Sequence, residues 1–126
     1  MPIPANWSPR LLSLLRFVVG LGFLQHGMSK YFGIPPFPGQ LTPLLYTAGA
    51  LEFVGGVLLV IGLFTRPVAF ILSGMSAVAY FMVHAPKSFF PAENMGEAAM
   101  LYCFVFLYLA AAGGGPWSID ATRKAP

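Results

Sequence analysis

The sequence predicts an all-α membrane protein with a single domain, residues 1–126, that crosses the bilayer as an antiparallel bundle of four helices. Hydrophobic residues make up 57% of the chain and charged residues only 9%, which is too little charge to cover the surface of a soluble domain. The apolar residues also lie in long runs, whereas a subunit buried in a soluble oligomer would carry them in short elements broken by polar turns. Lipid is therefore expected to act as part of the solvent.

The first two spans are separated by a proline-rich segment. The first span is expected over about residues 11–31, after Ser8-Pro9, which is typical of a helix start. The segment 33–39 cannot be helical, because its three prolines lack a backbone N–H and favour extended geometry in the residues before them. The second span covers about residues 41–64 and holds one charged residue, Glu52, close to its middle.

The remaining two spans follow a short turn at Thr65-Arg66. The third span is expected over residues 67–84, with Pro67 in its first turn, where proline is well tolerated. A loop over residues 85–95 leads to the fourth span, residues 97–113, which ends in a glycine-rich segment. Spans of about 17 to 24 residues match an apolar core about 30 Å thick.

The basic residues predict the orientation. Four spans place both termini on one side of the membrane, and the positive-inside rule makes the side with more Lys and Arg cytoplasmic. The terminal side holds Arg10, Arg66, Arg123 and Lys124, and the other side holds Lys30 and Lys87. Both termini are therefore expected on the cytoplasmic side of the membrane. These residues are scattered singly, so no nucleic-acid partner is expected.

Several ionisable residues lie inside the predicted spans, where each costs about 2.5 to 3.5 kcal/mol or more. Those expected near the non-cytoplasmic end are His26, Lys30, His84 and Glu97. Together with Glu52 as its floor, they predict one polar pocket that opens to the outer face. Arg16 and Glu52 are predicted to form a buried ion pair across two helices.

The polar residues allow two interpretations. In the first, they are structural pairs that only fix how the helices pack in lipid. In the second, the pocket binds a lipid head group, a quinone or a small polar solute. No metal is expected, because the chain has neither a His-x-x-His nor a Glu-x-x-His pair. Since Cys103 is the only cysteine, redox chemistry would have to come from a cofactor or a partner.

Several motifs follow one another in a fixed order along the chain. They are Arg16, the HGMSKYFG run 26–33, the run 52–66 with its E-x-x-G-G and T-R elements, His84, the NMGE run 94–97 and the GPWSID run 115–120. This order resembles that of the DoxX family of small bacterial membrane proteins over residues 16–120. The family usually has two glycines before the Glu of the fourth span, where this chain has Met95-Gly96.

The resemblance implies a four-helix protein of a bacterial inner membrane. The family takes its name from a likeness to a subunit of an archaeal thiosulfate:quinone oxidoreductase. It also implies an association with redox, sulfur or oxidative-stress systems. The first hypothesis is therefore a membrane component of a quinone-linked redox system, a subunit without a catalytic motif of its own. The alternatives are a small transporter or channel subunit, which would have to form a homo-oligomer, and a structural or assembly partner in a membrane protein complex.

Overall fold

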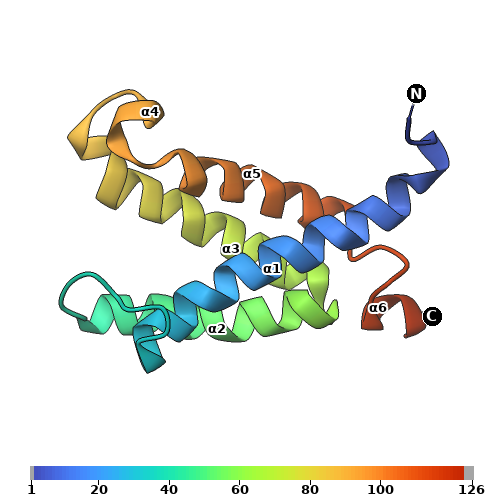
Figure 1. Ribbon diagram of the computed structural model, residues 1–126, viewed down its shortest axis with the longest axis horizontal. Helices are drawn as coiled ribbons and strands as arrows, with labels where there is room; N and C mark the ends of the chain where they lie inside the picture. The colour runs from blue at the N-terminus through green and yellow to red at the C-terminus, as the bar shows by residue number, and fades with distance from the viewer. Residues whose placement is uncertain (1, 124–126) are drawn as a thin grey trace.

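The computed structural model describes residues 2–123, and Lys124 of the predicted cytoplasmic end lies outside them. The described chain is all helical without a strand, which confirms the predicted all-α class (Figure 1). Its helical elements are η1 (Ala5–Trp7), α1 (Ser8–Phe32), α2 (Pro43–Ile61), α3 (Thr65–Ala79), the π-helical turn η2 (Tyr80–His84), η3 (Ala85–Lys87), α4 (Pro91–Asn94), α5 (Glu97–Ala112) and α6 (Ile119–Thr122).

Local sequence signals set the ends of the first long helices. α1 has Pro9 in its first turn and ends at Gly33, which is left-handed with φ 67°. Thr42 caps α2, because its hydroxyl accepts a hydrogen bond of 3.2 Å from the backbone N–H of Leu45. α2 ends at Gly62, also left-handed with φ 72°. Glycine adopts this conformation without steric cost, so both helices stop where the sequence allows it.

Three helical stretches are long and apolar enough to cross a membrane: Ala5–Phe32, Pro43–Ile61 and Thr65–Lys87. The third continues from α3 through η2 and η3 and so extends beyond the predicted end of the third span. α5 is also apolar but has only 16 residues. The outer surfaces of these helices carry large apolar side chains, such as Phe70 at 64% exposure and Phe104 at 65%. Such a surface suits a lipid environment.

The long helices form two pairs. α1 packs mainly on α2, and α3 packs mainly on α5 (Figure 1). α1 and α2 approach closely through glycines: a Cβ on Gly27 would lie 2.6 Å from the backbone nitrogen of Phe53, and one on Gly56 would lie 2.7 Å from that of Leu24. No larger residue fits either position without moving a helix, so these glycines fix how far α1 is shifted along α2.

A small apolar core joins the two pairs at the middle of the molecule. Every long helix contributes to it, and its side chains are at most 6% exposed. Its members are Phe23, Leu59, Ala69, Leu72, Phe106 and Leu109.

Arg16 is buried at one end of the molecule, and within residues 2–123 its hydrogen bonds go only to backbone carbonyl groups. Its Nε donates to the carbonyl of Leu59 in α2 at 2.8 Å. Its Nη1 donates to the carbonyl of Gly114, and its Nη2 donates to that of Trp117 at 2.9 Å. The guanidinium group thus joins α1 to the end of α2 and to the segment that follows α5.

The predicted pairing of Arg16 with Glu52 is wrong in the structure, because Glu52 binds Lys30 instead. The packing of α1 against α2 places Arg16 beside Leu59, which lies seven residues along α2 from Glu52, or about 10 Å. The prediction used depth along the helices, and depth alone does not decide which residues face each other.

The C-terminal segment closes the same end. The carboxylate of Asp120 in α6 accepts hydrogen bonds from the backbone N–H groups of Phe64 at 2.8 Å and Thr65 at 2.9 Å, at the start of α3. Burial acts to raise the pKa of Asp120, but the hydrogen bonds from Thr65 and Phe64 and the attraction of Arg123 outweigh it and lower this pKa below its ordinary 3.8. We call this end, with Arg16 and Asp120, the closed end.

Candidate functional site: a polar cavity at the open end

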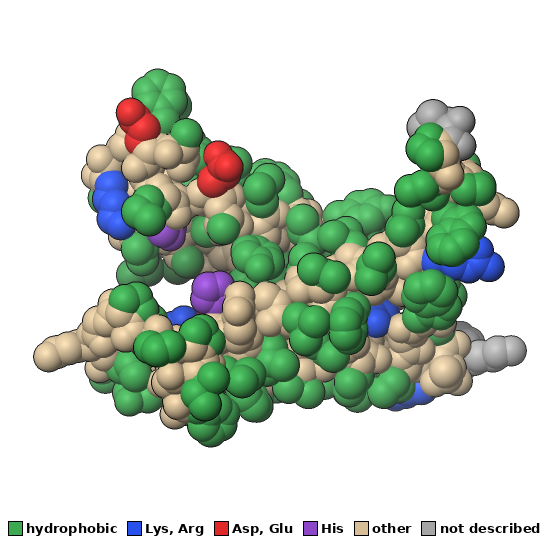
Figure 2. All heavy atoms as spheres, in the orientation of Figure 1, with side chains coloured by type: hydrophobic (Ala, Val, Ile, Leu, Met, Phe, Trp, Pro, Cys, Tyr) green, Lys and Arg blue, Asp and Glu red, His purple; other side chains and the backbone are tan. Residues whose placement is uncertain are grey.

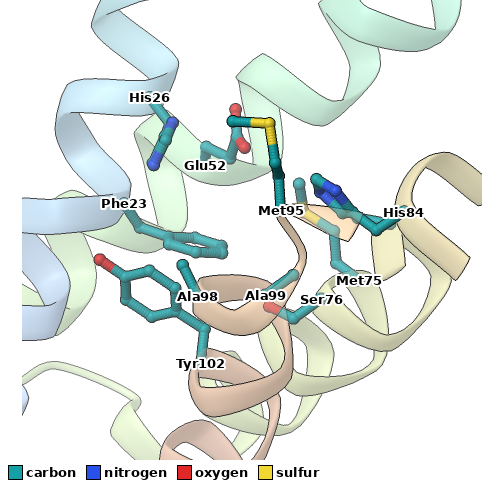
Figure 3. Close-up of a pocket in the computed structure, with 11 residues that line it drawn as sticks. Phe23, His26, Glu52, Met75, Ser76, His84, Met95, Ala98, Ala99 and Tyr102 are labelled. Atoms are coloured by element: carbon teal, nitrogen blue, oxygen red, sulfur yellow. The ribbon is translucent and has the colours of Figure 1, made fainter. Parts of the chain in front are cut away.

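The two helix pairs part at the opposite end, which we call the open end. Figure 2 shows the molecule hollowed there, with histidine side chains on both sides of the hollow. The hollow contains a cavity of about 300 Å³, to which α1, α2, α3 with η2, and α5 all contribute. The residues that line it are Phe23, His26, Glu52, Met75, Ser76, Ala79, His84, Met95, Ala98, Ala99 and Tyr102 (Figure 3).

Glu52 reaches the cavity from α2 and is held by a buried ion pair. Its Oε1 lies 2.6 Å from the Nζ of Lys30, and the two side chains are 9% and 8% exposed. Lys30 does not line the cavity itself. Lys30 neutralises the charge of the carboxylate without lining the cavity. Glu52 can therefore present an oxygen to the cavity without leaving an unpaired charge in lipid.

His84 reaches the cavity from the other helix pair, at the end of the π-helical turn η2. Its Nδ1 lies 3.0 Å from the backbone carbonyl oxygen of Asn94. A carbonyl oxygen can only accept a hydrogen bond, so Nδ1 carries the proton and Nε2 of the neutral ring is an acceptor. π-helical turns are rare and often occur at functional sites, because they change the direction of a side chain within a helix.

Asn94 holds this part of the site together, although the sequence analysis did not select it. The residue is fully buried, and its amide donates to the hydroxyl of Tyr80 at 3.0 Å and to the carbonyl of Ser88 at 3.0 Å. Its Oδ1 accepts a hydrogen bond of 2.8 Å from the backbone N–H of Gly96. The loop that orients His84 is therefore tied to η2 and to the start of α5 by one side chain.

His26 lies on the α1 side of the cavity. Its ring packs edge-on against Phe23, with 6.0 Å between the ring centroids. In Figure 3 it lies near Glu52, whereas His84 lies on the other side of the cavity. Polar groups thus face the cavity from both sides.

The remaining walls are aromatic or apolar. Phe23 and Tyr102 pack at 4.9 Å between ring centroids, and Phe23 also meets Phe106 at 4.8 Å. Met95 lies at the mouth, with its backbone in the left-handed conformation at φ 62° and its side chain 78% exposed. This strained conformation favours glycine and explains why two glycines suit the motif here.

The predicted site residues divide into three groups. The structure brings His26, Glu52 and His84 together around the cavity. Lys30 acts through its contact with Glu52. Glu97 does not take part, because it begins α5 with its side chain exposed. Within residues 2–123, no group of three or more His, Cys, Asp or Glu side chains is arranged to hold a metal ion.

The arrangement can bind a flat ring that has polar atoms on opposite edges. The His26 ring can donate a hydrogen bond on one side, while the neutral His84 ring can accept one on the other. Apolar and aromatic walls between them suit the two faces of a ring.

Comparison with known proteins adds a family and several relatives. The DoxX family model matches residues 11–85. An uncharacterised protein of Haemophilus influenzae is 42% identical over 91% of this chain and 92% of its own length. The Bacillus subtilis protein named "Putative oxidoreductase CatD" is 32% identical, covering 85% of this chain and 82% of the relative. The Escherichia coli "Inner membrane protein YqjF" is 28% identical, covering 87% and 84%. No solved structure matches the chain.

Proposed function

The chain belongs to the DoxX family of membrane proteins, and we propose that it is a membrane component of a quinone-linked redox or oxidative-stress system whose cavity receives the quinone ring. One observation carries the proposal: His26, Glu52 and His84 come from three helical segments and face one cavity of about 300 Å³ with aromatic walls. The name of the Bacillus subtilis relative, "Putative oxidoreductase CatD", agrees with a redox role.

The two sides of the cavity offer hydrogen-bonding groups for both the quinone and the quinol form of the ligand. A quinone oxygen only accepts hydrogen bonds, and an imidazole N–H can supply one. A quinol hydroxyl can donate to Nε2 of His84 or to the carboxylate of Glu52. The chain supplies binding and proton exchange in this proposal, and the electrons pass to or from a partner protein.

The proposal includes the topology. The single domain 1–126 crosses the inner membrane four times, with α5 as the fourth span, and both termini lie in the cytoplasm. Figure 1 supports this arrangement, because η1 and α6 lie at the same end of the molecule, the closed end. The cavity then opens towards the outer face. A reporter that is active only in the cytoplasm should be active when fused after Thr122. A reporter that is active only outside the cytoplasm should be active when fused in the 33–39 loop.

We do not propose transport through the chain. Beyond the cavity lie the core residues Leu72, Phe106 and Leu109, each at most 1% exposed. A path from the open end to the closed end would have to pass these side chains, which fill the space between the helix pairs.

The binding test measures quinone in the protein purified from bacterial membranes in mild detergent. Solvent extracts of the wild type should contain quinone, and His84→Ala should lower its amount about tenfold, as expected for loss of one hydrogen bond to a buried ligand. Glu97→Gln is the matched control, because Glu97 lies nearby but outside the cavity, and it should retain quinone. Equal quinone in all three proteins, or none in the wild type even after added quinone, would overturn the proposal.

A further inference from the structure

An apolar groove lies beside the cavity, between α2 and the third apolar stretch. Its volume is about 370 Å³. Apart from Thr47, its lining is aliphatic or methionine, without a charged or aromatic side chain. The α2 side consists of Leu44, Leu45, Thr47, Ala48 and Leu51, and the other side consists of Ile71, Met75, Val78, Ala79, Met82 and Val83.

The groove and the cavity are neighbours that share two wall residues. Met75 and Ala79 of α3 line both of them. The side chain of Ala79 is a single methyl group, and that of Met75 is flexible. Neither therefore forms a rigid barrier between the two spaces. α2 and α3 each pack mainly on another helix, so the contact between them is smaller than that within either helix pair.

The lining indicates what each space accepts. The cavity offers imidazole and carboxylate groups together with aromatic walls, which suits a polar ring. The groove offers a flexible aliphatic surface along membrane-spanning helices, which suits a hydrocarbon chain. A molecule with a polar ring and a long apolar tail would fill both spaces at once.

We infer that the ligand is an amphiphile that enters from the bilayer between α2 and α3, with its ring in the cavity and its tail along the groove. This inference rests on the proposed function for the ring. It adds the class of ligand, a quinone with an isoprenoid or alkyl tail, and the side of the protein from which it enters.

The test uses a quinone whose alkyl tail carries a diazirine, with the full-length protein in liposomes. After irradiation, mass spectrometry of peptides locates the labelled residues. Labelling should concentrate on residues 44–51 and 71–83 and should fall when an excess of the same quinone without a tail is added. Affinity of the tail is not a suitable measure, because moving it from lipid to protein brings little hydrophobic gain.

Two substitutions on one helix provide matched variants. Ala48→Phe fills the groove and should lower labelling there about fivefold, since overpacking costs about 1 kcal/mol or more. Ala50→Phe makes the same change in another apolar groove of about 260 Å³, lined by Tyr31, Phe32, Phe53 and Val54, which shares no residue with the cavity. This second variant should leave labelling unchanged.

The outcomes separate the inference from the proposed function. Labelling that the tailless quinone displaces, but that maps to the Ala50 groove or to α5, would overturn the inference while supporting the ring site. Labelling spread evenly over all lipid-facing helices and not displaced would overturn both. Displaceable labelling in the α2–α3 groove that Ala48→Phe lowers and Ala50→Phe preserves would establish the inference.

Discussion

Arg16 and Glu52 are both charged residues buried within apolar helices, but the two ends of the molecule satisfy them in different ways. At the closed end, Arg16 binds the backbone carbonyls of Leu59, Gly114 and Trp117. At the open end, Glu52 binds one side chain, Lys30, and still faces the cavity. The hydrogen bonds of Arg16 all go to the backbone, whereas Glu52 keeps an oxygen available to a ligand.

This difference indicates that the closed end stabilises the fold and the open end serves binding. Hydrogen bonds that Arg16 donates and that Asp120 accepts fix the chain segments at the closed end to one another. At the open end, hydrogen bonds orient His84 and Glu52 but leave a cavity between the helix pairs. Substitutions at the closed end should therefore affect mainly stability, and those at the open end mainly binding.

The largest effect is expected for Arg16→Leu. The change removes three hydrogen bonds from a charged donor. Each is worth about 1.5 kcal/mol, so the free energy of unfolding should fall by about 4 to 5 kcal/mol. Unfolding in mixed detergent micelles measures it. A loss below about 1 kcal/mol would show that the closed end does not depend on Arg16.

The next effect tests the pair Lys30–Glu52. Lys30→Met or Glu52→Leu alone leaves one buried charge and should cost about 3 kcal/mol, whereas the double variant should cost much less than the sum. The control is Arg16→Leu combined with Glu52→Leu, which should be additive within about 0.5 kcal/mol. Non-additivity in the control and additivity in the pair would favour the ion pair predicted from sequence.

Asp120 should produce a moderate, pH-dependent effect. Its pKa in the folded protein lies below the ordinary 3.8, so the stability it contributes is complete at neutral pH and is lost as pH falls through 3.8 towards the lower folded value. Asp120→Asn should cost about 1 kcal/mol at pH 7, because one amide oxygen replaces two acceptors. Thermal unfolding between pH 3 and 7 should show a smaller pH dependence in the variant than in the wild type.

The smallest effect on stability is expected for His26→Ala. The His26 ring is exposed, and only its contact with Phe23 is lost, so unfolding should change by less than about 0.5 kcal/mol. Quinone retention should nevertheless fall. A large loss of stability would mean that the open end also supports the fold, which would remove the contrast between the two ends.

The fold class and the helices were accessible from sequence because apolar runs and proline- or glycine-rich breaks are local signals. The first and second helices, Ser8–Phe32 and Pro43–Ile61, lie close to the predicted residues 11–31 and 41–64. The third differs more: it reaches Lys87 because a π-helical turn and a 3₁₀ turn continue the helix past His84. Those turns depend on contacts with Asn94 that lie outside the span itself.

The candidate site was only partly accessible, and the reasons are geometric. Depth along a helix placed His26, Glu52 and His84 near one another, but it could not show that Lys30 rather than Arg16 faces Glu52. That choice depends on how the glycines of α1 and α2 set the helices against each other. The depth of Glu97 also placed it in the predicted pocket, but the rotation of α5 leaves its side chain exposed. Asn94 acts on His84 through its backbone carbonyl, which no side-chain pattern reveals.

The way Arg16 is bound has a consequence for how this sequence can vary. Because its partners are backbone carbonyls, the bonds to the guanidinium group do not depend on the chemistry of the side chains at positions 59, 114 and 117. An alignment of relatives should therefore show an arginine that stays constant with no position changing in concert. Lys30 and Glu52, which meet through their side chains, should instead be kept or replaced together. Contact maps inferred from covariation would then show the open end more clearly than the closed end that holds the fold.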